Sequence, residues 1–188
     1  MISKIVFFGR IAPNKKQDDI IRIFDHYHRK FNPSSALYLI GQKQIKPYVQ
    51  ELEELVQTLG LSDNVVFTGK ITDKELNTYY RNADVFVCMS EHEGFCVPLV
   101  ESMFFNIPII AYDSSAIRDT LGDASILLQN KEAEPVSRLI DKVTKDRSFR
   151  QEIIEKQKKP LPVFQSDTLK RKLMKVIREI QDSIYNTQ

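Results

Sequence analysis

The sequence of 188 residues contains no tryptophan, only six glycines and only two cysteines. Cys88 and Cys96 are too few to form a disulfide framework, so a reducing compartment is expected. No apolar run is long enough to span a bilayer. Lys and Arg total 27 against 25 for Asp and Glu, which excludes nucleic-acid binding driven by bulk charge. With 42% hydrophobic residues, the composition is that of one globular domain.

Two phosphate-binding loops of other nucleotide enzymes are also missing. No Gly-x-Gly-x-x-Gly follows a predicted strand, which disfavours a nicotinamide dehydrogenase, and no Gly-x4-Gly-Lys-Ser/Thr supports a P-loop enzyme. His26 and His28 are two residues apart on a predicted helix and therefore do not share a face. No zinc-ligand spacing accompanies His92. We therefore expect no metal site.

Short apolar runs alternate with stretches of helical period along most of the chain. The predicted strands are 5–8, 36–40, 64–67, 84–89, 107–112 and 125–128. The predicted helices are 18–31, 46–59, 72–82, one opened by Pro98, 133–144, 148–158 and 167–184. This order predicts an α/β fold, a Rossmann-like parallel sheet with helices on both faces. We place one domain at residues 1–160 and a C-terminal helix at 161–188, which packs on this domain or toward a missing N-terminal domain.

Cationic side chains follow the first predicted strand, where a sheet of this kind binds its ligands. Arg10 comes directly after Gly9, and Lys15 and Lys16 open the next helix. An arginine fork and a lysine ammonium are suited to a phosphate group. Taken alone, the pattern is more typical of solvated loop cations.

The stretch SEHEGFCVPLVE, residues 90–101, is the most specific pattern in the chain. It places Glu93 after a strand and then begins a helix, whose free N–H groups favour an anion. Glu101 lies about one turn into that helix, and its side chain is expected to point back toward the pocket of Glu93. Carboxylates beside a phosphate site need hydroxyl partners, and vicinal sugar hydroxyls fit this need. The simpler alternative is that both glutamates only favour the helix N-terminus.

Together these motifs resemble the C-terminal domain of retaining glycosyltransferases of the GT-B fold, the large group 1 family that builds lipopolysaccharide, capsule and phosphoinositol mannosides. The family's GR…K pattern is matched by GRIAPNKK, and its Glu-x7-Glu motif by EGFCVPLVE. Its glycine after the second strand is matched by LIGQ, and its V-x-F-x-G stretch by VVFTG. The resemblance covers residues 3–130. Cys96 stands where the family usually has glycine, which makes the donor sugar harder to infer.

The resemblance implies a role for each residue of this set. Arg10 and Lys15 would bind the donor diphosphate, with Lys16 as a substitute for Lys15, Glu93 would hold the transferred sugar, and Glu101 would bind the ribose. The implied catalytic residues are Arg10, Lys15 and Glu93. The implied donor-binding residues are Gly9, Arg10, Lys15, Lys70, Ile71, Glu93, Gly94, Phe95, Cys96, Val97, Leu99 and Glu101. Lys70 and Ile71 would lie near the nucleobase, and backbone N–H groups at Val97 and Leu99 near the phosphates.

The resemblance thus predicts the donor-binding domain of a glycosyltransferase that uses a nucleoside diphosphate sugar and no metal or other cofactor. The glycan or lipid-linked acceptor would bind through an N-terminal domain that is missing here, so this chain alone is expected to be inactive. We expect the protein in the cytoplasm. The basic residues between 156 and 175 have two interpretations: a solvated helix face, which we favour, and peripheral contact with the inner face of the membrane. A non-catalytic Rossmann-like module that binds a nucleotide or a partner protein remains the alternative, and a phosphorylase or epimerase a weaker one.

Overall fold

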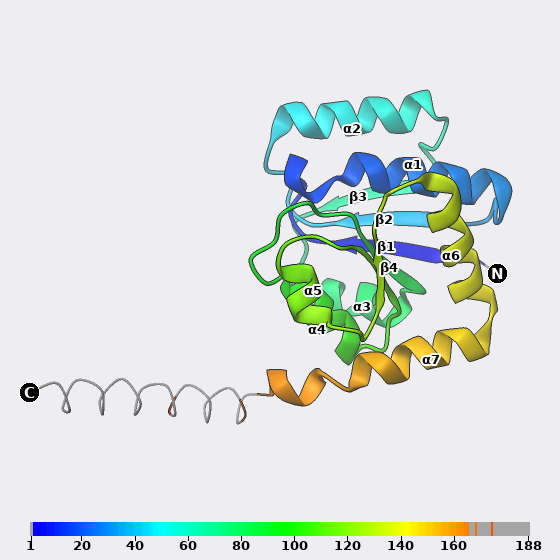
Figure 1. The fold of residues 1–188 in the computed structure, drawn as a ribbon. Coiled ribbons are helices and arrows are strands. Elements are labelled where there is room, and N and C mark those ends of the chain that lie inside the picture. Colours follow the sequence, from blue (N-terminus) through cyan, green and yellow to red (C-terminus); the bar gives the residue numbers. More distant parts are fainter. Residues whose placement is uncertain (1, 166–167, 169–173, 175–188) are drawn as a thin grey trace, which may run out of the picture.

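A single parallel β-sheet forms the centre of the protein, in a computed structural model that describes residues 2–165, 168 and 174. In this part of the chain the sheet has six strands in the order β3-β2-β1-β4-β5-β6 (Figure 1). The strands are β1 (Lys4–Phe8), β2 (Ala36–Ile40), β3 (Val65–Gly69), β4 (Val85–Cys88), β5 (Ile109–Tyr112) and β6 (Ile126–Leu128). Each neighbouring pair is parallel, which confirms the predicted Rossmann-like α/β fold.

Helices cover both faces of this sheet (Figure 1). They are α1 (Gln17–Lys30), α2 (Lys46–Thr58), α3 (Asp73–Asn82), α4 (Val97–Phe104), α5 (Ala116–Leu121), α6 (Ala133–Lys145) and α7 (Arg147–Lys158), with the 3-10 turns η1 (Pro13–Lys15) and η2 (Leu161–Phe164). After β6 the chain returns, so that α6 packs on α1 and α7 on α4. The helix predicted over 167–184 lies outside the described residues. Within those residues, no helix is both long and apolar enough to cross a bilayer.

The central strands are apolar throughout because helices cover them on both sides. All four residues of β4 are fully buried, and Ile5 to Phe8 of β1 are also buried. A strand with one face in water would instead alternate apolar and polar residues. These continuous runs are the reason that the sequence predicts the strands at the right places. The bounds differ: the runs at 84–89 and 107–112 are each two residues longer than β4 and β5, and the run at 64–67 ends two residues before β3 does.

Polar contacts fix the ends of the helices. The capping box predicted at Thr72 is present: its N–H donates to Glu75 Oε2 at 2.8 Å, and the Glu75 N–H donates to Thr72 Oγ1 at 3.3 Å. At the other end of the domain, the buried amide of Gln157 on α7 accepts from the Ile109 N–H at 3.0 Å and donates to the Ile107 carbonyl at 2.8 Å. Gln157 therefore ties α7 to the start of β5.

The ends of β1 and β2 approach each other closely at two glycines. The Gly9 N–H donates to the Ile40 carbonyl at 2.9 Å. Gly41 has φ of +149°, and a Cβ atom added there would lie 2.0 Å from the Gly9 carbonyl oxygen. Only glycine fits this position without moving the loop that follows β1.

We expect Gly41→Ala to destabilise the protein by about 3 kcal/mol or more, because steric overlap adds to an unfavourable φ. Gly60→Ala is the matched control: its φ is +68°, but no atom lies within 4 Å of an added Cβ. The control should lose only about 1–2 kcal/mol. Urea unfolding of both variants measures the difference. Equal losses would show that the close approach does not constrain the fold.

Candidate functional site

The order of the strands reverses between β1 and β4. The chain moves outward from β1 to β3 on one side and from β4 to β6 on the other, so the loops after β1 and β4 lie at the switch point of the carboxyl edge. Sheets of this kind bind ligands in the crevice at that point. Two hydrogen bonds join these loops: the Glu91 N–H donates to the Asn14 carbonyl at 2.9 Å, and Asn14 Nδ2 donates to the His92 carbonyl at 3.1 Å. The two motifs that the sequence singles out therefore meet at one place.

Lys15 and Glu93 form an ion pair in this crevice. Lys15 Nζ lies 2.5 Å from Glu93 Oε2, and the two side chains are only 12% and 7% exposed. Each charge has lost most of its water, so each depends on the other for compensation. The structure thus brings together two of the residues predicted as catalytic, and pairs them directly with each other.

The loop that carries Glu93 is held by the residue before α5 and by a residue within this helix. The Glu93 N–H donates to Ser115 Oγ at 3.0 Å, and Thr120 Oγ1 donates to the Phe95 carbonyl at 2.8 Å. Ser115 has φ of 36°, an unfavourable conformation for a residue with a side chain. Sequence reasoning missed both residues and α5 itself; the Ser-Ser pair that follows β5 was the available signal.

Cys96 is the residue before α4 and has φ of 60°. The helix then begins at Val97 and has Pro98 in its first turn, as predicted. The first N–H groups of a helix have no partner within the helix and favour an anion. Leu99, predicted to approach the phosphates, donates its N–H to the Cys96 carbonyl at 2.9 Å, so a ligand would have to compete for it. Gly94, Phe95 and Val97 are exposed at the edge of the crevice.

Glu101 is oriented by a buried tyrosine that the sequence did not suggest. Tyr80 OH donates to Glu101 Oε2 at 2.6 Å. The Tyr80 ring stacks on Phe8 and on Phe105, with centroid separations of 3.8 and 4.9 Å. Burial and the bond to Glu101 raise the pKa of Tyr80, so this hydroxyl remains a donor. The carboxylate of Glu101 is therefore held in place by a rigid partner.

The other predicted residues lie along the same edge. Arg10 is exposed, and its NH1 donates to Gln44 Oε1 at 3.2 Å. Lys16 pairs with Asp18 at 3.1 Å rather than with Glu93. Lys70 and Ile71 directly follow β3, so they too are at the carboxyl end of a strand.

Lys131 links three parts of the edge, and nothing in the sequence singled it out. Its Nζ lies 3.0 Å from Asp19 on α1, 2.8 Å from Glu91 in the loop after β4, and 4.5 Å from the centre of the Tyr112 ring. The hydrogen bond from Lys131 lowers the pKa of Glu91. The segment before α6 thus holds the loop that carries Glu93.

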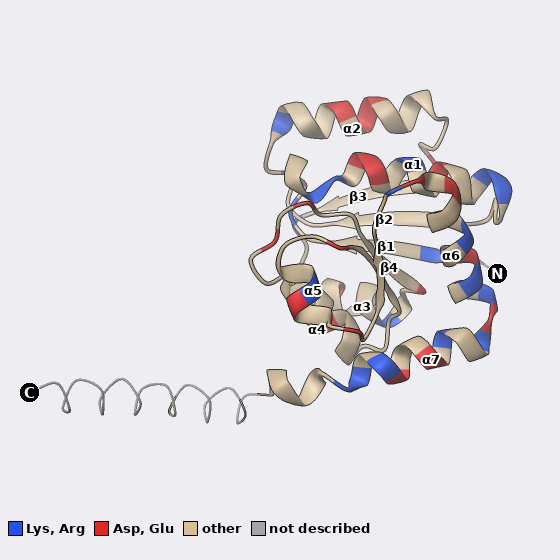
Figure 2. Ribbon diagram, in the orientation of Figure 1, with Lys and Arg blue, Asp and Glu red and all other residues tan. Residues whose placement is uncertain are grey.

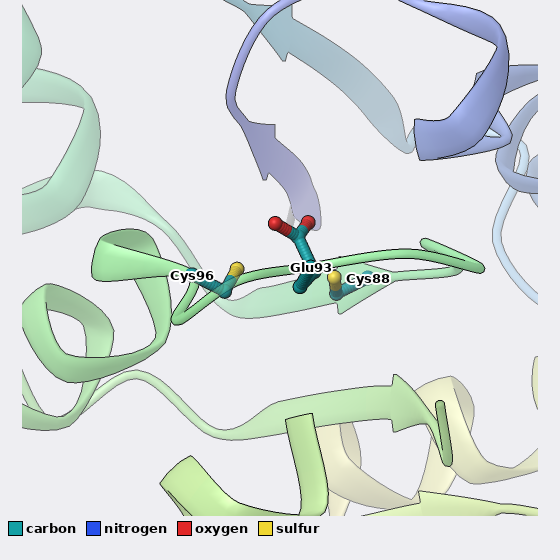
Figure 3. Close-up of side chains that lie close together, drawn as sticks. All are labelled: Cys88, Glu93 and Cys96. Carbon is teal, nitrogen blue, oxygen red and sulfur yellow. The ribbon is translucent and has the colours of Figure 1, made fainter. Parts of the chain in front are cut away.

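A cluster of potential metal ligands adjoins the ion pair. Ligand atoms of Cys88, Glu93 and Cys96 all lie within 4.8 Å of one another (Figure 3). Their spacing in the sequence is not that of a zinc motif, which is why the pattern did not predict them as a set.

The basic residues near the end of α7 are interspersed with acidic ones (Figure 2). Lys156 pairs with Glu152 at 2.7 Å, and Lys158 with Glu155 at 2.8 Å. This arrangement fits the favoured interpretation of a solvated helix face. Most of the predicted basic stretch beyond residue 165 lies outside the described residues.

Comparison with known proteins gives a family match over most of the chain. The profile of the family described as "Glycosyl transferases group 1" matches residues 3–160. Mannosylfructose-phosphate synthase of Agrobacterium fabrum is 33% identical over 111 residues, which are 56% of this chain and 24% of that enzyme. The GDP-mannose-dependent alpha-(1-6)-phosphatidylinositol monomannoside mannosyltransferase of Mycolicibacterium smegmatis is 30% identical over 126 residues, 63% of this chain and 32% of that enzyme. The chain thus spans a third or less of the length of these two relatives.

The fold is also that of a solved domain. The C-terminal domain of a glycosyl transferase group 1 family protein (LpcC) from Francisella tularensis superposes with a TM-score of 0.72 and 27% identity, covering 82% of both chains. The sucrose-phosphate synthase of Thermosynechococcus elongatus shares the fold, with a TM-score of 0.80 at 21% identity over 96% of this chain and 46% of that one.

A double-mutant cycle tests whether the Lys15–Glu93 pair is energetically coupled. With Lys15→Met, Glu93→Gln and the double variant, we expect a coupling free energy of about 1–3 kcal/mol in urea unfolding, because both charges are largely desolvated. The matched control is Lys43 and Glu53, a pair at 2.6 Å whose side chains are 37% and 44% exposed. Its coupling should stay below about 1 kcal/mol. Equal coupling in the two cycles would contradict a special role for burial.

Proposed function

Because the chain belongs to the glycosyl transferases group 1 family, we propose that it is the donor-binding domain of a retaining glycosyltransferase. It would take a hexose from a nucleoside diphosphate sugar and pass it to a glycan or lipid-linked acceptor in the synthesis of a surface polysaccharide. The observation that carries the proposal is the buried ion pair that Lys15, in the segment after β1, forms with Glu93, in the loop between β4 and α4.

In this proposal the diphosphate is bound by positive charge from two sources. Arg10 is exposed, and its NH1 donates to the neutral side-chain amide of Gln44. Turning this nitrogen toward a phosphate would therefore break a hydrogen bond to a neutral group and not an ion pair. The N-terminus of α4 adds its partial positive charge, and the Val97 N–H would approach the phosphates. These charges would also stabilise the leaving nucleoside diphosphate. Since side chains and the helix supply the charge, the transfer needs no metal ion.

Lys15 and Glu93 would exchange partners when the donor enters. The Lys15 ammonium can turn toward the diphosphate, and the carboxylate of Glu93 can then accept hydrogen bonds from the hydroxyls of the sugar. Both groups are largely buried, so neither can be left without a partner. The ion pair therefore neutralises both side chains until the donor binds. Lys15 and Glu93 would separate only for a ligand that carries both a negative phosphate and hydroxyl groups.

Glu101 would bind the ribose of the donor. Tyr80 already donates to Oε2, which fixes the carboxylate while leaving Oε1 to accept from vicinal ribose hydroxyls. Backbone groups of Lys70 and Ile71 would lie near the nucleobase, since both follow β3 at the same edge.

The acceptor would bind to another domain, because the curated relatives are several times longer than the matched segment. Closure of two domains brings donor and acceptor together and excludes water. We therefore expect this chain alone to bind the donor and to transfer little sugar. The reaction would take place on the cytoplasmic side of the membrane, where a lipid-linked acceptor can be reached.

Calorimetric titration with UDP, GDP and ADP, in the presence of a chelator, tests the donor site. We expect one of the three to bind, and Arg10→Ala to weaken that binding at least about tenfold, since it removes a charged hydrogen bond worth about 1.5–3 kcal/mol. Arg138→Ala is the control, because Arg138 is exposed on α6 and pairs with Glu134. Binding that is absent, or that is the same in Arg10→Ala and Arg138→Ala, would contradict the proposal.

The ribose contact is tested with the 2′-deoxy analogue of whichever nucleotide binds. We expect the wild-type protein to prefer the ribonucleotide by about tenfold, the value of one hydrogen bond to a charged group. Glu101→Ala should remove this preference and leave the deoxynucleotide affinity nearly unchanged. A preference that persists in Glu101→Ala would assign the ribose to another residue.

A further inference from the structure

Cys88, Glu93 and Cys96 converge from three positions around one loop. Cys88 is the last residue of β4, Cys96 precedes α4, and Glu93 lies between them. One ligand atom from each lies within 4.8 Å of the other two (Figure 3). We propose that these three side chains form a binding site for a thiophilic divalent cation of the Zn²⁺ or Cd²⁺ class.

The ligand set fits such an ion. Two thiolates and one carboxylate are ligands that Zn²⁺ accepts, and the thiolates select against Mg²⁺ and Ca²⁺. In a tetrahedral site with Zn–S bonds of about 2.3 Å, the ligand atoms would lie about 3.7 Å apart. The ligand atoms therefore need to approach one another by at most about an ångström. Glu93 and Cys96 are in the loop and can move, whereas Cys88 is fixed in the sheet.

The charges also balance. Without metal, Glu93 is compensated by Lys15. When an ion binds, the negative charges of two thiolates balance the two positive charges of the ion. Glu93 can ligate the ion through one oxygen and still accept a hydrogen bond from Lys15 through the other. Lys15 would then orient the carboxylate that ligates the ion.

Three protein ligands leave a fourth position for water or an exogenous group. That position would face the crevice, because Cys96 is the partly exposed member of the set. If the proposed function holds, the bound ion occupies Glu93 and obstructs the site of the donor sugar. The ion would then be an inhibitor of donor binding and not a cofactor.

Titration of the fully reduced protein with Cd²⁺, in a phosphine reductant, tests the site directly and without nucleotide. We expect an ultraviolet thiolate-to-metal charge-transfer band that saturates at one ion per chain, with release of two protons per ion in an unbuffered solution. The chain has only two cysteines, so the band can come from no other thiol. Cys88→Ser and Cys96→Ser nearly preserve the side-chain volume. Each variant should lose coordination of the ion by two thiolates and release at most one proton.

His92→Ala is the matched control, because this exposed imidazole adjoins the site without belonging to it. The control should keep the band, the stoichiometry and both protons. Circular dichroism establishes that each serine variant is folded, and the proton count on the wild-type protein provides a test that needs no variant. The proposal is overturned if no band forms, if no proton is released, if light scattering shows that the band forms only when the ion joins two chains, or if folded Cys88→Ser binds as the wild type does. A site that binds Cd²⁺ but leaves nucleotide affinity unchanged would refute only the inhibition.

Discussion

Lys15 and Glu93 face each other because β1 and β4 are neighbours in the sheet and the segments that follow them are joined by hydrogen bonds of Asn14. The pair is the centre of the crevice, and the surrounding contacts serve to hold it. Ser115 fixes the backbone of Glu93 from the α5 side, and Asn14 joins the two loops. Lys131 holds the same loop from the α6 side through Glu91. Residues distant in the sequence thus support two charges that have lost most of their water.

A carboxylate next to a phosphate site would ordinarily weaken anion binding. Here the charge of Glu93 is neutralised by Lys15 in the absence of a ligand, so the crevice does not repel an approaching diphosphate as strongly as an isolated carboxylate would. Once a ligand supplies phosphate for Lys15 and hydroxyls for Glu93, the two groups can separate without either remaining unpaired. A simple nucleotide without a sugar satisfies only one of them. The ion pair therefore favours the complete donor over its fragments.

The sequence predicted what depends on short-range pattern, and missed what depends on tertiary contact. Continuous apolar runs gave the strands, and Thr72 with Glu75 gave the start of α3. Helix α5 has only six residues, too few for a helical period to be recognised. Tyr80 and Lys131 belong to ordinary helical and loop stretches, and only the folded chain brings them to Glu101 and Glu91. The residues implied by resemblance do lie along one edge, but their contacts with a donor remain predictions.

Cys96 combines a backbone suited to glycine with a side chain that glycine lacks. Its φ of 60° costs a residue with a Cβ atom about 1–2 kcal/mol, and glycine would avoid that cost. The side chain packs against the apolar core and contacts Cys88, and these interactions offset the strain. The same side chain occupies space beside Glu93 that a glycine would leave open. A cysteine here therefore does two things at once: it narrows the region proposed for the sugar, and it completes a pair of thiols that a metal ion can bridge.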